Sequence, residues 1–96
     1  MEVCLSWYDE SEYVKLQERV GQPLLPYAEW LAAFEDAQQW YVRQCGSVLV
    51  TTITADELLN YAFAMGIQVG PVASASYAVA AASGQIVAPV RRVSAH

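Results

Sequence analysis

The chain has 96 residues and a formal net charge of −5, with five basic residues against ten acidic ones. Hydrophobic residues make up 55 % of the sequence and charged residues only 16 %, which excludes the polar, charge-rich composition that keeps chains disordered. The acidic balance also argues against a nucleic-acid contact, because the basic cluster Arg91-Arg92 is too small to neutralise a run of phosphates. We therefore expect one folded domain with no nucleic-acid partner.

The apolar content exceeds what a domain of this size can enclose. A chain of this length buries roughly 60 to 70 % of the surface that its unfolded form exposes. This chain holds three Trp, six Tyr and two Phe in addition to its aliphatic residues. Some large apolar side chains must then stay near the surface unless a second subunit covers them. The composition therefore predicts a homo-oligomer.

The first half of the chain predicts one strand and two helices. Residues 2–8 alternate with the period of a strand, and Asp9 with Glu12 matches a capping box at the start of a helix over 10–20. The following Pro-Leu-Leu-Pro run makes a rigid connector, because proline lacks the amide donor that a helix needs. A long helix is expected over 27–45. It carries two adjacent apolar stripes, of which a single neighbouring element can cover only one.

The second half predicts one strand and two more helices. The β-branched run over 47–53 is typical of a strand, and Thr54 with Glu57 repeats the capping box at the start of a helix over 55–65. A last helix is expected over 71–83, opening at a proline after a glycine. Its inward-facing residues are predicted to be Val72, Ala75, Ser76, Val79 and Ala82.

These elements predict an α+β fold in the order β-α-α-β-α-α, with a single domain over 1–84 and an extended or frayed tail over 85–96. The two strands are expected to pair within the chain, although a two-stranded sheet is marginal alone and could extend across a dimer. No charged residue occurs between Leu58 and Val90. Because Ala, Ser and Gly dominate 69–90, and insertion favours larger apolar residues, we expect no membrane span.

Residue types that usually carry catalysis or bind metal are scarce. The one histidine is His96, and the two cysteines, Cys4 and Cys45, lie far apart in sequence and are predicted to be packed thiols. No zinc-ligand spacing and no glycine-rich phosphate loop occurs. Adjacent carboxylates such as Glu35-Asp36 point about 100° apart on a helix, so they do not converge on one substrate atom. The sequence therefore favours a protein without catalytic residues, metal or cofactor.

Aromatic residues form the candidate interaction surface. Helical spacing by itself places aromatic residues on a buried face, so core packing or self-association is the default interpretation, with a partner-binding groove or a small-molecule pocket as alternatives. The candidate interface residues are Trp40, Trp30, Tyr27 and Tyr77. Trp40 is the strongest candidate, because it lies on the second stripe of the long helix near its polar edge.

Three longer motifs occur: Trp-Tyr-Asp-Glu at 7–10, Leu-Leu-Pro-Tyr-Ala-Glu-Trp-Leu at 24–31, and Asp-Glu-Leu-Leu-Asn-Tyr-Ala at 56–62 followed by Gly66. Together they resemble a group of short uncharacterised bacterial proteins, hypothetical proteins of unknown function. In that group a strand, a Pro-Tyr-x-Glu-Trp-Leu helix, a second strand and a Leu-Leu-x-Trp-Cys-like helix recur. The resemblance spans about residues 6–80 and implies no known activity. Here Tyr61-Ala62 stands where that group tends to have Trp-Cys.

Surplus apolar surface without a reactive constellation favours a non-catalytic protein that self-associates and acts by binding another protein. We expect it to be cytoplasmic, because the first residues show no secretory signal pattern. Two alternatives stay open. One is a small acidic inhibitor or nucleic-acid mimic that occupies a basic site on a target. The other is an enzyme that uses two carboxyl groups alone, and the spatial arrangement of the acidic residues discriminates among the three.

Overall fold

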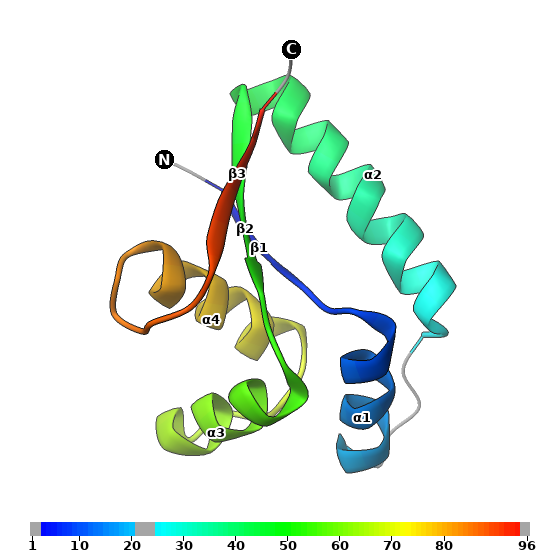
Figure 1. Ribbon diagram of the computed structural model, residues 1–96, viewed down its shortest axis with the longest axis vertical. Coiled ribbons are helices and arrows are strands. Elements are labelled where there is room, and N and C mark those ends of the chain that lie inside the picture. The colour runs from blue at the N-terminus through cyan, green and yellow to red at the C-terminus, as the bar shows by residue number, and fades with distance from the viewer. Residues whose placement is uncertain (1–2, 21–24, 95–96) are drawn as a thin grey trace.

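The computed structural model describes residues 3–20 and 25–94, and within these the chain forms four helices and a three-stranded mixed sheet (Figure 1). The elements in chain order are β1 (Cys4–Trp7), α1 (Glu10–Val20), α2 (Tyr27–Cys45), β2 (Ser47–Thr52), α3 (Ala55–Met65), α4 (Pro71–Ala82) and β3 (Val90–Ser94). The predicted α+β class is confirmed, and every predicted helix and strand is present with closely similar bounds. The observed fold differs from the predicted one in having a third strand, β3.

The sheet has the order β1-β2-β3. β1 and β2 pair within the chain, as expected, and they run parallel in a register that places Cys4 beside Leu49 and Trp7 beside Thr52. A parallel pair needs a long crossover connection, and α1 and α2 together supply it. β3 returns antiparallel along the other edge of β2. The expected two-stranded sheet is therefore wrong in detail.

The sequence predicts an extended or frayed tail over 85–96, and its part Val90–Ser94 is extended and paired with β2 as β3 rather than frayed. The Val90–Ser94 segment lacks the alternation of apolar and polar residues that predicts a strand, because two adjacent arginines lie between its valines. Backbone pairing with β2 holds it instead, and the Thr51 hydroxyl donates to the Pro89 carbonyl oxygen at 2.6 Å. The folded domain thus extends past residue 84, while residues 95 and 96, including His96, lie outside the described residues.

Helices cover both faces of the sheet (Figure 1). The Ser6 hydroxyl donates to the Ser74 carbonyl oxygen at 2.7 Å, so the face that Ser6 shares with Thr51 lies against α4. The opposite face carries Val48 and Val50, both buried, and α2 packs against β2 on that side. α1 and α3 contact each other beyond the ends of β1 and β2 where those strands finish.

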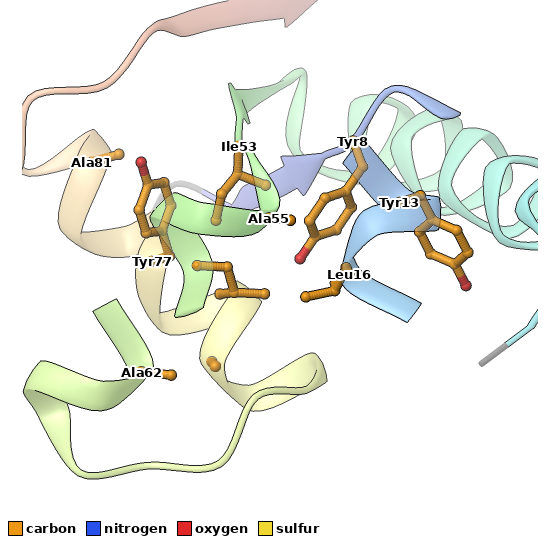
Figure 2. Close-up of a cluster of buried hydrophobic side chains, with 10 residues drawn as sticks. Tyr8, Tyr13, Leu16, Ile53, Ala55, Ala62, Tyr77 and Ala81 are labelled. Carbon is orange, nitrogen blue, oxygen red and sulfur yellow. The ribbon is translucent and has the colours of Figure 1, made fainter. Parts of the chain in front are cut away.

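The main core lies at this end of the sheet, among α1, α3 and α4 (Figure 2). Its members are Tyr8, Tyr13, Leu16, Ile53, Ala55, Leu58, Ala62, Ala73, Tyr77 and Ala81. Tyr8 directly follows β1 and Ile53 directly follows β2. Because the two strands are parallel, both side chains lie at the same end of the sheet and pack in the same core. Four of the members are alanines, which let α3 and α4 approach closely.

The predicted inward face of α4 is wrong. The buried residues of α4 are Ala73, Tyr77, Ala78, Ala80 and Ala81, whereas Val72, Ala75 and Val79 are exposed and Ser76 and Ala82 are half-buried. The helix is apolar on all sides, so periodicity could not identify the core side. Packing determines which side of α4 faces the core, because small alanines fit its close contacts with β1 and α3, while Tyr77 extends into the core.

Candidate functional site

The structure separates the four predicted interface residues into three environments. Trp40 is 51 % exposed on the outer side of α2 and meets the Tyr41 ring edge-on, with the ring centroids 5.1 Å apart. Tyr27 and Trp30 are half-buried near the start of the same helix. Tyr77 is only 4 % exposed and belongs to the core, so it offers no surface to a partner. Trp40 is therefore the member of the set that is open to contact.

Tyr27 and Trp30 attach α2 to the rest of the molecule. Their rings stack on each other with centroids 5.5 Å apart, and Trp30 also contacts the Tyr8 ring at 5.3 Å and the Tyr13 ring at 5.4 Å. The Tyr27 hydroxyl donates to the Tyr8 carbonyl oxygen at 2.9 Å. Burial, together with the charges of Asp9, Glu10 and Glu35, raises the pKa of Tyr27. Even so, no residue of α2 is fully buried, so its outer side is left uncovered.

Further large apolar side chains are exposed in the uncharged part of the chain. Phe63, near the end of α3, is 90 % exposed. The others in this part are Met65, Ile67, Val72, Val79, Val87 and Val90. Single exposed apolar residues are common, but here seven of them fall within residues 58–90, where the sequence has no charge at all.

A cavity of about 370 Å³ lies beside β1, between α1, the start of α2 and the start of α4. Most of its wall is apolar and includes Leu5, Leu16, Leu25, Trp30, Leu58 and Pro71. Within the described residues, no charged side chain lines it. It is large enough to hold a small molecule, since pockets for such ligands measure about 300 to 1,000 Å³.

Four of the described lining residues carry a hydroxyl group, and three of these groups, those of Ser6, Tyr8 and Ser74, lie together, while the Tyr13 hydroxyl donates to the Leu25 carbonyl oxygen. The Tyr8 hydroxyl and the Ser74 Oγ lie 2.5 Å apart and share a hydrogen bond in which either can be the donor. The Ser6 Oγ donates to the Ser74 carbonyl oxygen at 2.7 Å. Desolvation by burial raises the pKa of Tyr8, against a smaller opposing effect of the Ser74 hydrogen bond. Tyr8 therefore presents a neutral hydroxyl at physiological pH.

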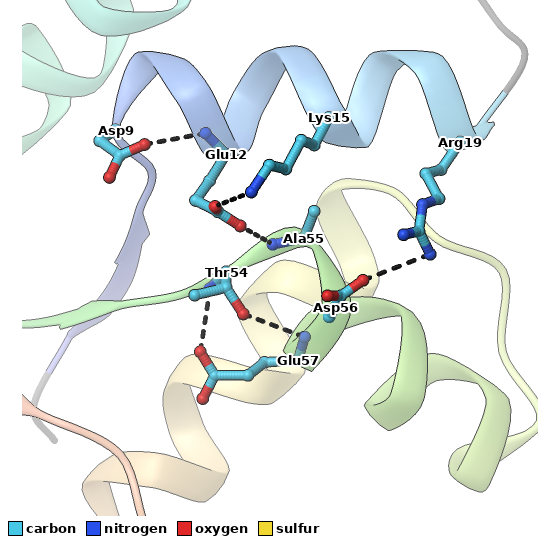
Figure 3. Close-up of polar contacts among 8 residues, drawn as sticks. All are labelled: Asp9, Glu12, Lys15, Arg19, Thr54, Ala55, Asp56 and Glu57. Carbon is cyan, nitrogen blue, oxygen red and sulfur yellow. Dashed lines mark hydrogen bonds and ion pairs between the residues drawn. The ribbon is translucent and has the colours of Figure 1, made fainter.

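The clustered carboxylates of α1 and α3 serve mainly to cap helices (Figure 3). Thr54 and Glu57 form the predicted capping box, with both of its hydrogen bonds at 3.1 Å. The Asp9 carboxylate accepts from the Glu12 backbone amide at 2.8 Å, but the Glu12 carboxylate does not accept from the Asp9 amide, as a full capping box requires. It accepts instead from the Ala55 amide at 2.9 Å and from Lys15 Nζ at 3.1 Å.

These contacts join α1 to the N-terminus of α3. The hydrogen bond from the Ala55 amide, followed by the contact with Lys15, lowers the pKa of Glu12. Arg19 of α1 adds an exposed ion pair with Asp56 at 3.3 Å. Asp9, Glu12, Asp56 and Glu57 are thus accounted for by capping and pairing, and none of them lines the cavity.

The cysteines and the acidic residues form no further constellation in the part of the chain that the structure describes. Neither Cys4 nor Cys45 forms a disulfide bond. Cys45 is exposed at the end of α2, so the expectation that both thiols are packed is wrong for it, whereas Cys4 is half-buried. Among residues 3–20 and 25–94, no group of three His, Cys, Asp or Glu side chains is placed to hold a metal ion.

Comparison of the chain with protein-family models, with curated proteins and with solved structures finds no match. The resemblance to short bacterial proteins therefore stays a prediction. None of the described helices combines the length and the apolar character that crossing a membrane requires.

The cavity is the feature that sequence reasoning missed. Trp30 was among the candidate aromatic residues, but Ser6 and Ser74 carried no signal in the sequence. These two serines are 68 positions apart and meet only because α4 packs across β1. No local pattern contains that information.

Proposed function

We propose that this protein is a non-catalytic, cytoplasmic interaction module that self-associates through apolar side chains on its surface. The observation that carries the proposal is the exposure of Phe63, 90 % open to solvent, in a stretch of the chain that has no charge. Exposed aromatic residues without charged neighbours are typical of association surfaces, and their burial between two copies is favourable.

Trp40, on α2, supplies a second apolar contact. It is half exposed, it is held edge-on by Tyr41, and Trp is the residue type that most often carries binding energy in interfaces. Because α2 leaves its outer side uncovered, a second copy or another protein can reach Trp40 without any rearrangement of the fold.

The acidic alternatives receive less support. Four carboxylates, those of Asp9, Glu12, Asp56 and Glu57, are used within the fold. An acidic mimic needs its carboxylates gathered on one open face, and an enzyme that uses carboxylates alone needs two of them in a cleft. Among the described residues, none of those that line the cavity beside β1 carries a carboxylate. Solubility and capping account for the acidic residues.

Sedimentation velocity at micromolar concentration tests the proposal. We expect the wild-type protein to form a dimer or a larger oligomer. Phe63→Glu and Trp40→Glu each place a charge in an apolar contact, so at least one of them should weaken association by about tenfold or more. The matched controls are Asn60→Glu for Phe63 and Gln39→Glu for Trp40, because each adds the same charge at an exposed position on the same helix.

Two outcomes would overturn the proposal. One is a wild-type protein that stays monomeric throughout the micromolar range. The other is association that Phe63→Glu and Trp40→Glu leave as strong as their controls do, because the interface would then involve neither apolar side chain.

A further inference from the structure

The cavity beside β1 has the features of a ligand site that is separate from the surfaces of Phe63 and Trp40. We propose that it binds a small, uncharged, mostly apolar molecule that carries one hydroxyl or carbonyl group. The walls come from β1, α1, α2, α3 and α4, so the site exists only in the folded domain. Its volume of about 370 Å³ falls within the range of pockets that enclose small organic molecules.

The wall chemistry defines the charge of the ligand. The lining includes four leucines and Trp30, and no basic or acidic side chain of the described residues lines the cavity. A charged group placed there would lose its hydration without gaining a partner of opposite charge, which is strongly unfavourable. A neutral apolar body gains by the same transfer, since its burial releases water from apolar surface on both molecules.

The hydroxyl pair of Tyr8 and Ser74 defines the polar group of the ligand. Each of these hydroxyls has one hydrogen and can accept hydrogen bonds. The bond between them, at 2.5 Å, uses one of the two hydrogens, so the pair retains one O–H donor as well as acceptor lone pairs. The Ser6 hydrogen is already committed to the Ser74 carbonyl oxygen. A hydroxyl or carbonyl group of the ligand can therefore form a hydrogen bond with the pair, and the ligand needs no charge to do so.

Titration of the ¹⁵N-labelled protein with three probes of similar shape tests the site by NMR. The probes are p-cresol, which is apolar with one hydroxyl, toluene, which lacks the hydroxyl, and p-toluate, which replaces the hydroxyl with a carboxylate. We expect p-cresol to cause saturable shifts of the amides of Ser6, Tyr8 and Ser74, toluene to bind more weakly, and p-toluate to cause no saturable shift.

Two substitutions locate the binding. Ala75→Trp places a large side chain at an exposed position of the cavity wall and should abolish p-cresol binding, whereas Val79→Trp, one turn further along α4 and outside the lining, should leave it unchanged. Ser74→Ala removes one hydroxyl of the pair, so the affinity for p-cresol should fall about three- to tenfold while that for toluene stays the same.

The proposal is overturned if p-cresol causes no saturable shift, if p-toluate binds as tightly as p-cresol, or if Ala75→Trp binds p-cresol like the wild-type protein. Should Ala75→Trp fail to fold, the comparison of p-cresol with toluene in Ser74→Ala still decides the question. The sites of Phe63 and Trp40 are not involved, so loss of self-association in Phe63→Glu or Trp40→Glu leaves the expected p-cresol shifts intact.

Discussion

Tyr77 shows how one buried side chain joins two helices. Its hydroxyl donates to Glu57 Oε2 at 3.2 Å, and its ring meets the Tyr61 ring edge-on at 5.5 Å. The other oxygen of Glu57, Oε1, accepts from the Thr54 amide. A single carboxylate thus caps α3 and satisfies the hydroxyl that α4 buries. Desolvation, followed by the charge of Glu57 and the hydrogen bond to it, raises the pKa of Tyr77 to about 12.

This raised pKa predicts a loss of stability in alkaline solution. Folded Tyr77 holds its proton to a higher pH than unfolded Tyr77 does, so its contribution is complete below pH 10 and is lost as the pH rises to about 12. The loss should reach roughly 2 to 3 kcal/mol. Urea unfolding across this range should show a smaller fall in the free energy of unfolding for Tyr77→Phe than for the wild-type protein. Parallel pH profiles of the two proteins would contradict the assignment.

The Thr54 cap predicts a measurable loss of stability on substitution. Thr54→Ala removes the acceptor of the Glu57 amide at the N-terminus of α3 and should lower the free energy of unfolding by about 1 kcal/mol. Ser11→Ala, at an exposed position in the first turn of α1, should change it by less than about 0.5 kcal/mol. Chemical denaturation of both variants measures the difference, and equal midpoints would mean that the cap contributes nothing.

The two capping motifs also show what local sequence can predict. Thr54 and Glu57 make the full box, because both hydrogen bonds of that motif lie within four residues. The Asp9 motif predicts the start of α1 correctly, yet the Glu12 side chain bonds to Ala55, which is 43 positions away. The same spacing of a capping residue and a glutamate thus gives a different side-chain partner once α3 packs beside α1.

At the scale of the element, the helices were predictable and the two sides of α4 were not. α1 begins, and α2 and α3 begin and end, at the residues that caps, proline and glycine indicate. α4 consists of Ala, Val, Ser and Tyr on every side, so no polar stripe marks its outer face. Its orientation depends on side-chain volume against β1 and α3, which is a property of the assembled fold.

β3 is the element that separates the observed fold from the predicted one, and Val93 tests it. Val93 is half-buried and lies opposite the buried Val48, whereas the next residue, Ser94, is exposed. Val93→Asp should lower the free energy of unfolding by about 2 kcal/mol, because it brings a charge against a covered face. Ser94→Asp should change it by less than about 0.5 kcal/mol. If thermal or urea unfolding gives the same small loss of stability for both variants, β3 contributes no more to the free energy of unfolding than a frayed tail would.

At the scale of the whole molecule, the sequence predicted surplus apolar surface but not where it lies. Trp40 is exposed as an interface residue must be, and Tyr77, chosen on the same reasoning, is in the core. Composition states how much apolar area a chain carries and gives no position for it. The cavity beside β1 depends on the meeting of five elements, so its residues could be recognised only after the fold had brought them together.

The net charge of −5 predicts how the proposed self-association responds to salt. Two copies repel each other through their negative charge, while the proposed contacts through Phe63 or Trp40 are apolar and insensitive to screening. Raising the ionic strength from about 0.01 M to about 1 M shortens the screening length from about 30 Å to about 3 Å, so the oligomer should become tighter. Gln39→Glu adds one negative charge at an exposed position and should steepen this dependence in sedimentation experiments. Weaker association at high salt would instead mean that ion pairs hold the copies together, which the uncharged segment of Phe63 cannot supply.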